Sequence, residues 1–439
     1  MCIRDRKKSG EVKKYDYVFR ATHHGPIARQ VGKKSVNTLR AVKICRLFDT
    51  NRIRQAFGMI RAQNLGEWRS AFGNCAIPMF NCVYADVDGN IQYIYNGSIP
   101  KRSENFDWKQ PVDGSVKQTE WNGVHTLDEL PQVINPPSGF VQNCNSSPFV
   151  TTDDGNPNIG DFPSYMFEDA DHDKRRSRLS RMLLRDAKNV SFGEFQGLAT
   201  DVRLYWALTE LPKAKRVFDR WQPSEPTKAA KIKPYLDHLL DWDCRASIAS
   251  TQTALCVAWY EELYGLGYPA ETIKEKYRDP VRRLKALSLA AKSLKRTHGD
   301  WKVVWGDVHR LARVSKKSTV VRAALAMNRM LESEPCPGAP GPLGIMFTVY
   351  SSPTVPFVRP HRYAIVGNSY MAAIEFAPKV RGVSLTPFGV SGDSKSPHYF
   401  DQAKWFSNRE MKEAWFYEDE VLEHAKSSTR LDAVQSGTK

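Results

Sequence analysis

The sequence of 439 residues has no hydrophobic run long enough to cross a membrane. A spanning helix needs about 18 consecutive apolar residues, and the apolar stretch 286–294 already contains Lys292 and is followed by Lys295. An integral membrane protein with helical spans is therefore excluded. The first residues, Met1–Lys8, are charged and lack the apolar core of a signal peptide, so they predict no export signal.

The sequence also lacks the motifs of the best-known catalytic and metal sites. Its eight cysteines include no C-x-x-C pair and no zinc-like spacing, and a bridge between Cys75 and Cys82 stays open. No glycine-rich phosphate loop and no metalloprotease histidine pair occur. Gly389–Gly392 is close to a nucleophile elbow, but Asp393 stands where the final glycine is required. We therefore do not expect Ser391 to be a nucleophile.

Acidic side chains are fewer than basic ones, at 48 Asp and Glu against 64 Lys and Arg, which gives a net charge of +16. Much of the excess lies in 1–48, where 13 basic side chains face three acidic ones. Basic proteins often bind nucleic acid, but this segment has few aromatic side chains and no recognition motif. A solvated charged surface is the favoured interpretation. Retention on a DNA column at low salt would support the alternative.

Composition is that of a globular protein, with 41% apolar and 26% charged residues. The first third is predicted to be β-rich, with a hairpin over Val83–Tyr95 whose turn contains Asp88-Gly89, a pair suited to tight hairpin turns. Helical periodicity interrupts it at 51–62 and 64–71. Further predictions here are a strand over 16–21, a short helix or turn over 127–133, a strand over 140–143, and a polar loop over 146–163.

The pattern along the chain predicts four parts, namely a β-rich part (1–173), a mainly helical part (174–334), returning strands (335–427) and a tail (428–439). The proline-rich segment Pro335–Pro342 marks the end of the helical part. Strands, then helices, then strands indicate one α+β body with a helical insertion. Helices are predicted over 174–186, 199–208, 229–240, 248–263, 280–294 and 320–330, and strands over 345–351, 363–367 and 372–376, with turn-rich sequence from there to Asp401.

Six segments occur in an order that is more specific than any one of them. They are Thr22–Ile27, Asp86–Arg102, Glu120–Gly123, Leu130–Phe149, Trp305–Arg310 and Gly392–Phe406. Together they resemble the large chain of the penicillin acylase family of N-terminal-nucleophile hydrolases, which cleave amide bonds. The aculeacin-type and acyl-homoserine-lactone acylases look most similar. The resemblance extends from about Tyr15 to Ser427 and implies a partial αββα sandwich, without its N-terminal strands, that carries a helical insertion.

The resemblance assigns roles to two residues. In the family, a serine freed by self-cleavage attacks the amide carbonyl, with its own α-amino group as the base. Asn145, in the sequence Asn143-Cys144-Asn145, matches the asparagine that donates to the oxyanion. We expect it to continue a strand that places Asn143 on the same face. Arg175 matches an arginine at the start of the following helix, with Arg176 as the alternative one residue later.

A purely structural role is the alternative for both assignments. The asparagines could merely bond a neighbouring loop, and Arg175 could lie on a surface helix. His24, His309 and His398 lie in family-like segments, but we expect packing or turn roles for them.

One element of the family pattern has no counterpart in the sequence. No serine that heads a recognisable motif precedes His23, since Ser9 merely follows charged residues. We therefore expect this sequence to be a C-terminal portion of a precursor and to be inactive alone. Whether Met1–Arg6 is native stays open.

The resemblance also implies partners and a compartment. The substrate would be an N-acyl amide, such as a lipopeptide, an acyl-homoserine lactone or a β-lactam side chain. A small chain of the same precursor would be the protein partner, with no nucleic acid, in the periplasm or outside the cell. Catalysis needs no cofactor. Calcium binds some family members, but Asp153, Asp154 and Asp161 do not make a complete site, so a polar loop is expected.

A second hypothesis keeps the fold without the chemistry. In it, the chain is a structural or interaction module with no asparagine-dependent reaction.

Overall fold

The computed structural model describes residues 2–6, 12–16, 20–28, 39–95, 97–167, 173–265, 272–313, 333–351 and 361–429. These residues form two compact units, Met1–Asp173 and Lys174–Lys439. Among them, no helix combines the length and the apolar character that a membrane span requires.

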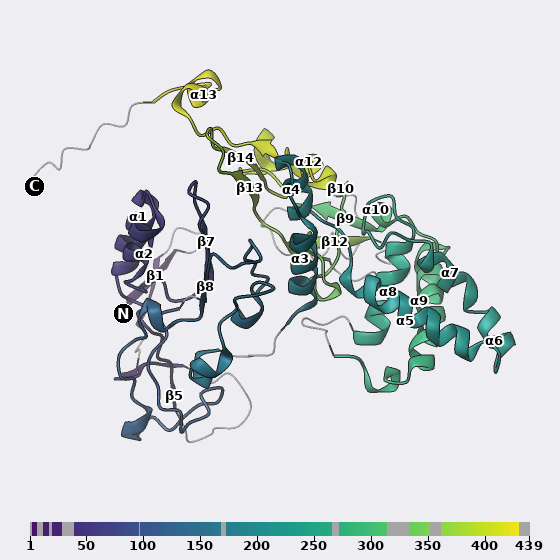
Figure 1. The fold of residues 1–439 in the computed structure, drawn as a ribbon, viewed down its shortest axis with the longest axis horizontal. Helices are drawn as coiled ribbons and strands as arrows, with labels where there is room; N and C mark the ends of the chain where they lie inside the picture. The colour runs from purple at the N-terminus through teal and green to yellow at the C-terminus, as the bar shows by residue number, and fades with distance from the viewer. Residues whose placement is uncertain are drawn as a thin grey trace, which may run out of the picture. The chain divides into compact units, whose positions relative to one another are not determined.

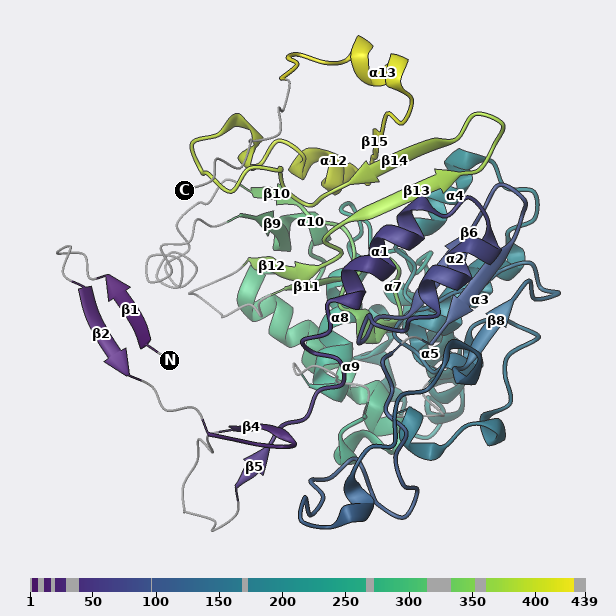
Figure 2. The same ribbon diagram turned by 90° about the vertical axis from the view of Figure 1, so that its left-hand side faces the viewer.

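The first unit is built around a three-stranded antiparallel sheet of β6 (Cys82–Ala85), β7 (Ile91–Ile94) and β8 (Gln132–Ile134). The predicted hairpin joins β6 to β7, and the Asp86 carboxylate closes its turn by accepting from the Asn90 backbone N–H at 2.9 Å. Helices α1 (Asn51–Arg61) and α2 (Leu65–Phe72) pack against each other, as Figures 1 and 2 show. Both helices confirm the predictions from periodicity.

The buried core of this unit is small. It joins Trp68 and Phe72 of α2 to Ile94 of the sheet and to Leu130. The other elements are short: β1 (Cys2–Arg6), β2 (Val12–Asp16), β3 (Ala21–Thr22), β4 (Gly25–Ala28), β5 (Arg40–Ala41) and the 3-10 helices η1 (Lys117–Thr119), η2 (Leu127–Glu129), η3 (Pro148–Val150), η4 (Ile159–Asp161) and η5 (Ser164–Met166). A strand was predicted over 16–21. In the structure β2 ends at Asp16 and β3 begins at Ala21, and residues 17–19 lie outside the described part.

The second unit begins with helices. They are α3 (Arg175–Asp186), α4 (Phe192–Ala199), α5 (Tyr205–Trp221), α6 (Pro226–Ala230), α7 (Lys233–Leu240), α8 (Gln252–Tyr264), η6 (Glu275–Tyr277), α9 (Pro280–His298) and α10 (Trp305–Val308). Helices α5, α7, α8 and α9 pack together around a core in which Trp206 and Trp259 meet edge to face at 5.1 Å (Figure 1).

One helix prediction in this unit is wrong and another lies outside the described residues. The predicted helix over 199–208 is broken, because α4 ends at Ala199 and α5 begins only at Tyr205. Between them Leu204 donates its backbone N–H to Cys244 O at 2.9 Å, so this segment pairs with a distant one instead of coiling. The helix predicted over 320–330 lies outside the described part of the chain.

Two small sheets complete the second unit (Figure 2). The first has the order β10 (Ser333–Pro335), β9 (His309–Ala312), β12 (Arg362–Gly367), β11 (Val349–Ser351), with β9 and β12 parallel. The second joins β13 (Met371–Glu375), β14 (Arg381–Leu385) and β15 (Lys412–Glu413). The remaining elements are η7 (Gly341–Leu343), η8 (Pro397–Tyr399), α12 (Ala403–Asn408) and α13 (Glu418–Glu423).

Strands β9 and β14 differ from the sequence predictions. β9 lies within the part predicted to be mainly helical (174–334), and β14 lies where only turns were predicted. β9 is short and pairs with β12, which lies far away in the sequence, as the pairing of His309 with Arg362 shows. Such a pairing leaves little local signal. β14, in contrast, forms a hairpin with the preceding strand β13.

Candidate functional site

The loop that carries Asn145 starts from an anchored asparagine. Asn135 accepts the Ile91 backbone N–H through Oδ1 at 2.8 Å and donates Nδ2–H to Asn90 Oδ1 at 3.0 Å. Its φ of 44° is in the left-handed region, which asparagine tolerates better than most residues. The two prolines that follow cannot continue a strand ladder, so the chain leaves the sheet at this point.

Asn143 and Asn145 do not lie in a strand, which corrects the prediction for 140–143. These residues have no ladder partner, and Asn145 has a φ of 57°. Its backbone N–H donates to Asn143 Oδ1 at 3.1 Å, a local bond by which an asparagine side chain replaces a backbone acceptor. The same-face relation predicted for the pair is therefore wrong. Asn143 shapes the turn, and Asn145 lies at its exposed tip.

Polar side chains hold the remainder of this loop. Asn156 Oδ1 accepts from the backbone N–H groups of Thr151 and Thr152, at 2.8 and 3.1 Å. Gln142 bonds both the Thr151 carbonyl through its backbone and the Val150 carbonyl through its side chain. These bonds fix the backbone of the segment that follows Asn145.

The aspartates of this region act on the loop itself. Asp154 Oδ1 accepts the Ser138 backbone N–H at 2.8 Å, which ties the polar loop to the turn after the prolines. Asp153, Asp154 and Asp161 do not form a group of three metal-ligand donors in the described structure.

Arg175 is the first residue of α3 and lies inside a polar and aromatic network of the second unit. Its Nη1 donates to the Pro342 carbonyl at 2.9 Å and to Tyr260 Oη at 3.1 Å. The guanidinium also lies 5.2 Å from the ring of Tyr264, which stacks on Tyr260 at 4.4 Å. Arg175 is half-buried, unlike an ordinary arginine of a surface helix.

A glycine makes this network possible. Gly344 has a φ of 74°, and a Cβ at this position would lie 2.7 Å from Arg175 Cβ and 2.8 Å from Tyr205 Cβ. Only glycine combines that backbone conformation with such a close approach. Tyr260 and Tyr264 were not among the residues singled out from the sequence, because they lie far from Arg175 along the chain and carry no motif. Pro342 was noted only as part of the proline-rich break at 335–342.

Asn145 belongs to the first unit and Arg175 to the second.

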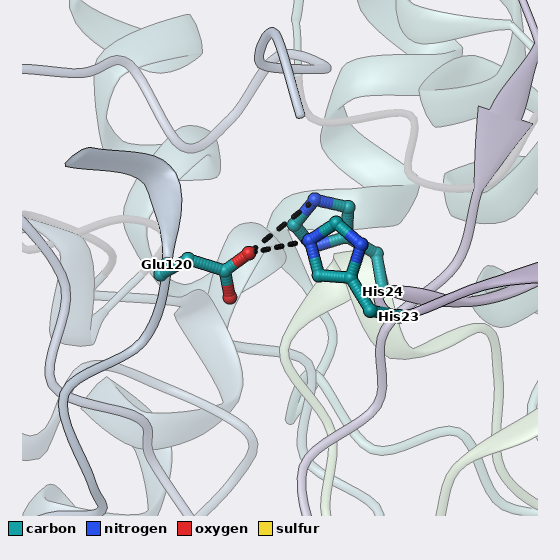
Figure 3. Close-up of side chains that lie close together, drawn as sticks. All are labelled: His23, His24 and Glu120. Atoms are coloured by element: carbon teal, nitrogen blue, oxygen red, sulfur yellow. Dashed lines mark hydrogen bonds and ion pairs between the residues drawn. The ribbon is translucent and has the colours of Figure 1, made fainter. Parts of the chain in front are cut away.

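One group in the described residues has the spacing of metal ligands. The donor atoms of His23, His24 and Glu120 lie within 4.8 Å of one another, and Figure 3 shows both rings turned toward the carboxylate. Existing partners use these atoms, however. Glu120 binds Lys43 Nζ at 3.0 Å and His23 Nε2 at 2.6 Å, and His24 Nε2 lies 2.8 Å from the Gly114 carbonyl.

The Lys43 hydrogen bond, and then the one from His23, hold the pKa of Glu120 below its ordinary value. The carboxylate is therefore ionised, paired with Lys43 and hydrogen-bonded to His23 already. We regard the group as an ion-pair network.

The other histidines have structural environments. His309 is fully buried, stacks on Trp305 at 4.5 Å and places Nδ1 2.7 Å from the Cys336 carbonyl. Burial lowers the pKa of His309 to about 3, so the ring is neutral near pH 7. His398 is exposed and pairs with Asp401 at 2.8 Å.

Ser391, Cys75 and Cys82 carry no reactive arrangement in the described residues. Ser391 Oγ accepts the Asp393 backbone N–H at 3.1 Å, in a loop that lacks the strand-to-helix turn of a nucleophile elbow. Cys75 and Cys82 are both free thiols in the structure, so no bridge joins them.

Comparison with known proteins places these features in a family. The sequence profile of the family described as Penicillin amidase matches residues 3–423. Penicillin G acylase of Escherichia coli is 38% identical over 89 residues, which cover 20% of this chain and 10% of that protein. Acyl-homoserine lactone acylase PvdQ of Pseudomonas putida is 23% identical over 434 residues, covering 91% of this chain and 52% of the relative.

A solved structure agrees with these relatives on the fold. The thermostable penicillin G acylase from Alcaligenes faecalis superposes with a TM-score of 0.63 at 19% identity, over 99% of this chain and 81% of that one. The fold is therefore the α+β N-terminal-nucleophile hydrolase fold. The chain spans about half the length of the acyl-homoserine lactone acylases that it matches. Because the profile match covers nearly the whole sequence, the chain belongs to the penicillin amidase family.

Proposed function

We propose that this protein hydrolyses the amide bond of an N-acyl substrate through a serine acyl-enzyme. The observation that carries the proposal is the family match over residues 3–423. The loop geometry supports it, because Asn145 stands at the exposed tip of a hydrogen-bonded turn where a substrate carbonyl can reach it. Relatives are named as acylases of penicillin G and of acyl-homoserine lactones, and amides of these classes are the first substrates to try.

Asn145 would act on the charge that develops during acyl transfer. The serine hydroxyl attacks the amide carbonyl carbon while its own α-amino group takes the hydroxyl proton. The carbonyl oxygen becomes an oxyanion, and Asn145 Nδ2–H donates to it. As the C–N bond breaks, the amine leaves with the proton. Water then attacks the acyl-serine ester and releases the carboxylate.

We assign the nucleophilic serine to a segment of the protein outside this sequence. The sequence contains no serine within the family's nucleophile motif, and Ser391 binds a backbone amide in a loop of the wrong geometry. The chain would then supply the oxyanion donor to a nucleophile on a companion chain of the same precursor. Such a precursor would be exported to the periplasm or the exterior before it processes itself.

Arg175 fits a positioning role in this scheme. Its bonds to Tyr260 and to the Pro342 carbonyl connect the start of α3 to α8 and to η7. It would keep this corner of the second unit rigid.

The test uses the protein purified from its native source. It is incubated with a phenylacetyl amide and with an acyl-homoserine lactone, and the released amine is quantified before and after treatment with a sulfonyl fluoride, which modifies activated serines. We expect hydrolysis, loss of activity on treatment, and the modified serine at the N-terminus of a segment that this sequence does not contain.

Two results would contradict the proposal. No hydrolysis of either amide by the native protein would favour the non-catalytic module. Hydrolysis by the 439-residue chain expressed alone would show that the nucleophile lies within it.

A further inference from the structure

A cavity in the first unit combines aromatic walls with a half-buried cation. Its volume is about 900 Å³, within the range of roughly 300–1,000 Å³ typical of small-molecule sites. The aromatic residues of its lining are Tyr95, Phe106, Trp108, Trp121, Tyr165 and Phe167.

Arg102 is the half-buried cation. Its guanidinium carbon lies 5.1 Å from the ring centre of Trp108 and 5.5 Å from that of Trp121. Its Nε is buried and has no hydrogen-bond partner. In the described part of the chain, Arg102 makes no ion pair with any carboxylate. Burial lowers the pKa of Arg102, yet a guanidinium remains charged at any physiological pH.

The other charges around the cavity are already engaged or exposed. Lys43 pairs with Glu120 at 3.0 Å while also lying 4.8 Å from the ring centre of Trp121. Asp107, the acidic residue of the lining, is exposed, and its Oδ1 accepts the Lys109 backbone N–H at 3.0 Å. Among the described residues that line the cavity, Arg102 is therefore a partly buried positive charge without a carboxylate partner.

The backbone around Arg102 is fixed by pairing. Lys101 N–H donates to the Gly123 carbonyl at 3.1 Å, and Asn122 N–H donates to the Lys101 carbonyl at 2.9 Å. The Trp108 indole N–H donates to the Ser103 carbonyl at 2.7 Å. The guanidinium and the two tryptophan rings are thus held in place before any ligand arrives, which reduces the entropy lost on binding.

Unpaired buried charge is unfavourable, and proteins normally pair it with a carboxylate or another anion. Stacking on aromatic rings offsets only part of the lost hydration, and it leaves the N–H donors at the edge of the guanidinium plane free to bind. Two of these donors match the two oxygens of a carboxylate. The aromatic walls match a flat apolar group.

We propose that this cavity binds a small aromatic carboxylate, with its carboxylate on Arg102 and its ring among the aromatic side chains. The site uses neither Asn145 nor Arg175, so the proposal does not depend on amide hydrolysis.

Isothermal titration calorimetry of the full chain with three probes tests this proposal. Phenylacetate has both the charge and the ring, phenylacetamide has the same shape without the charge, and acetate has the charge without the ring. We expect phenylacetate to bind about tenfold or more tighter than either of the others, because a charge-assisted pair and ring burial are each sufficient for such a factor.

Variants then locate the site. Arg102→Met should weaken phenylacetate binding about tenfold or more and change phenylacetamide binding by less than about threefold. Arg102→Lys keeps the charge but loses the bidentate geometry, so its affinity for phenylacetate should lie between those of the wild type and of Arg102→Met. Lys109→Met is the matched control, since this lysine lines the same cavity but is exposed, and it should leave both affinities nearly unchanged.

Several results would overturn the proposal. Equal affinities for phenylacetate and phenylacetamide would do so, as would full binding by Arg102→Met, or no heat with phenylacetate up to about 10 mM, the weak end of specific binding. If Arg102→Met fails to fold, the comparison of the charged and uncharged probes on the wild-type chain still decides the matter.

Discussion

The two units of the chain hold their informative residues in opposite ways. In the first unit, Asn145 lies at the exposed tip of a loop whose backbone amides are bound by Asn143, Asn156 and Asp154. In the second unit, Arg175 is half-buried beside Tyr260, next to a large helical core. The loop is shaped by local polar bonds, and the helical corner is shaped by packing.

This difference separates chemistry from stability. An exposed side chain at the tip of a loop fills no space in a packed core, so its removal affects whatever it binds more than it affects folding. For a side chain in the aromatic core the effect on folding is the larger one, because its loss leaves a cavity among closely packed neighbours. Substitutions in the two units should therefore separate into activity effects and stability effects.

The largest expected stability effect comes from Trp259 in α8. This side chain is 0% exposed, packs against Trp206 and donates its indole N–H to the Arg283 carbonyl at 3.0 Å. Trp259→Ala should destabilise the second unit by about 3–5 kcal/mol, as large-to-small core substitutions do. The measurement is chemical denaturation followed by the helical circular dichroism signal.

Trp415→Ala is the matched control, because this tryptophan lies in the same unit and is 50% exposed. It should change stability by no more than about 0.5–1 kcal/mol. Equal losses in the two variants would show that the helical core is not the main source of stability in this unit.

The next effect concerns rate. In the native protein, Asn145→Ala should lower kcat for the amide by about 10²–10³, equivalent to roughly 3–4 kcal/mol, because one oxyanion donor is lost. KM and the denaturation midpoint should stay near the wild-type values. The measurement is steady-state hydrolysis with the substrates named above.

Asn158→Ala is the matched control for this loop. Asn158 is exposed and only caps η4 by accepting the Gly160 backbone N–H at 3.2 Å. It should cost up to about 1 kcal/mol of stability and leave kcat within about twofold. A normal kcat in Asn145→Ala would remove Asn145 from the mechanism.

The last predicted effect is a change of stability with pH, and it comes from His309. Burial lowers its pKa from the ordinary 6.5 to about 3, so the unfolded chain binds a proton that the folded chain excludes. Its stabilising contribution is therefore complete above about pH 6.5 and is lost as the pH falls toward 3, at no more than about 1.4 kcal/mol per pH unit. Thermal denaturation at several pH values measures this slope.

His309→Phe removes the titrating group and keeps a ring to stack on Trp305. The variant should show a shallower loss of stability between pH 6.5 and 4 than the wild type. Parallel curves for the two proteins would mean that His309 does not titrate with unfolding.

Much of the secondary structure followed from local sequence. The helices at 51–61, 65–72, 175–186 and 280–298 and the hairpin of β6 and β7 agree with periodicity and turn residues. Strand β14 was not predicted, because Arg381–Leu385 contains a glycine and is too short to show a clear alternation of apolar and polar residues. It forms because β13 and β15 pair with it on both sides and Val383 and Leu385 become buried.

The asparagine motif shows the limit of local pattern most clearly. Residues two apart share a face only in an extended strand. In this chain the Asn143 side chain competes for the backbone of Asn145 and turns the segment into a loop. The motif was recognisable from its order in the sequence, while its geometry was not.

The sequence by itself determined the family resemblance, the long helices, the hairpin and the expectation that Asn145 and Arg175 matter, since each depends on residues close together or in a fixed order. Only the tertiary structure decided that Arg175 meets Tyr260, 85 residues away, that Arg102 contacts the rings of two tryptophans, and that His309 is fully buried. Contacts of this kind form when distant segments pack together to remove apolar surface from water, and no local pattern encodes which segments will meet.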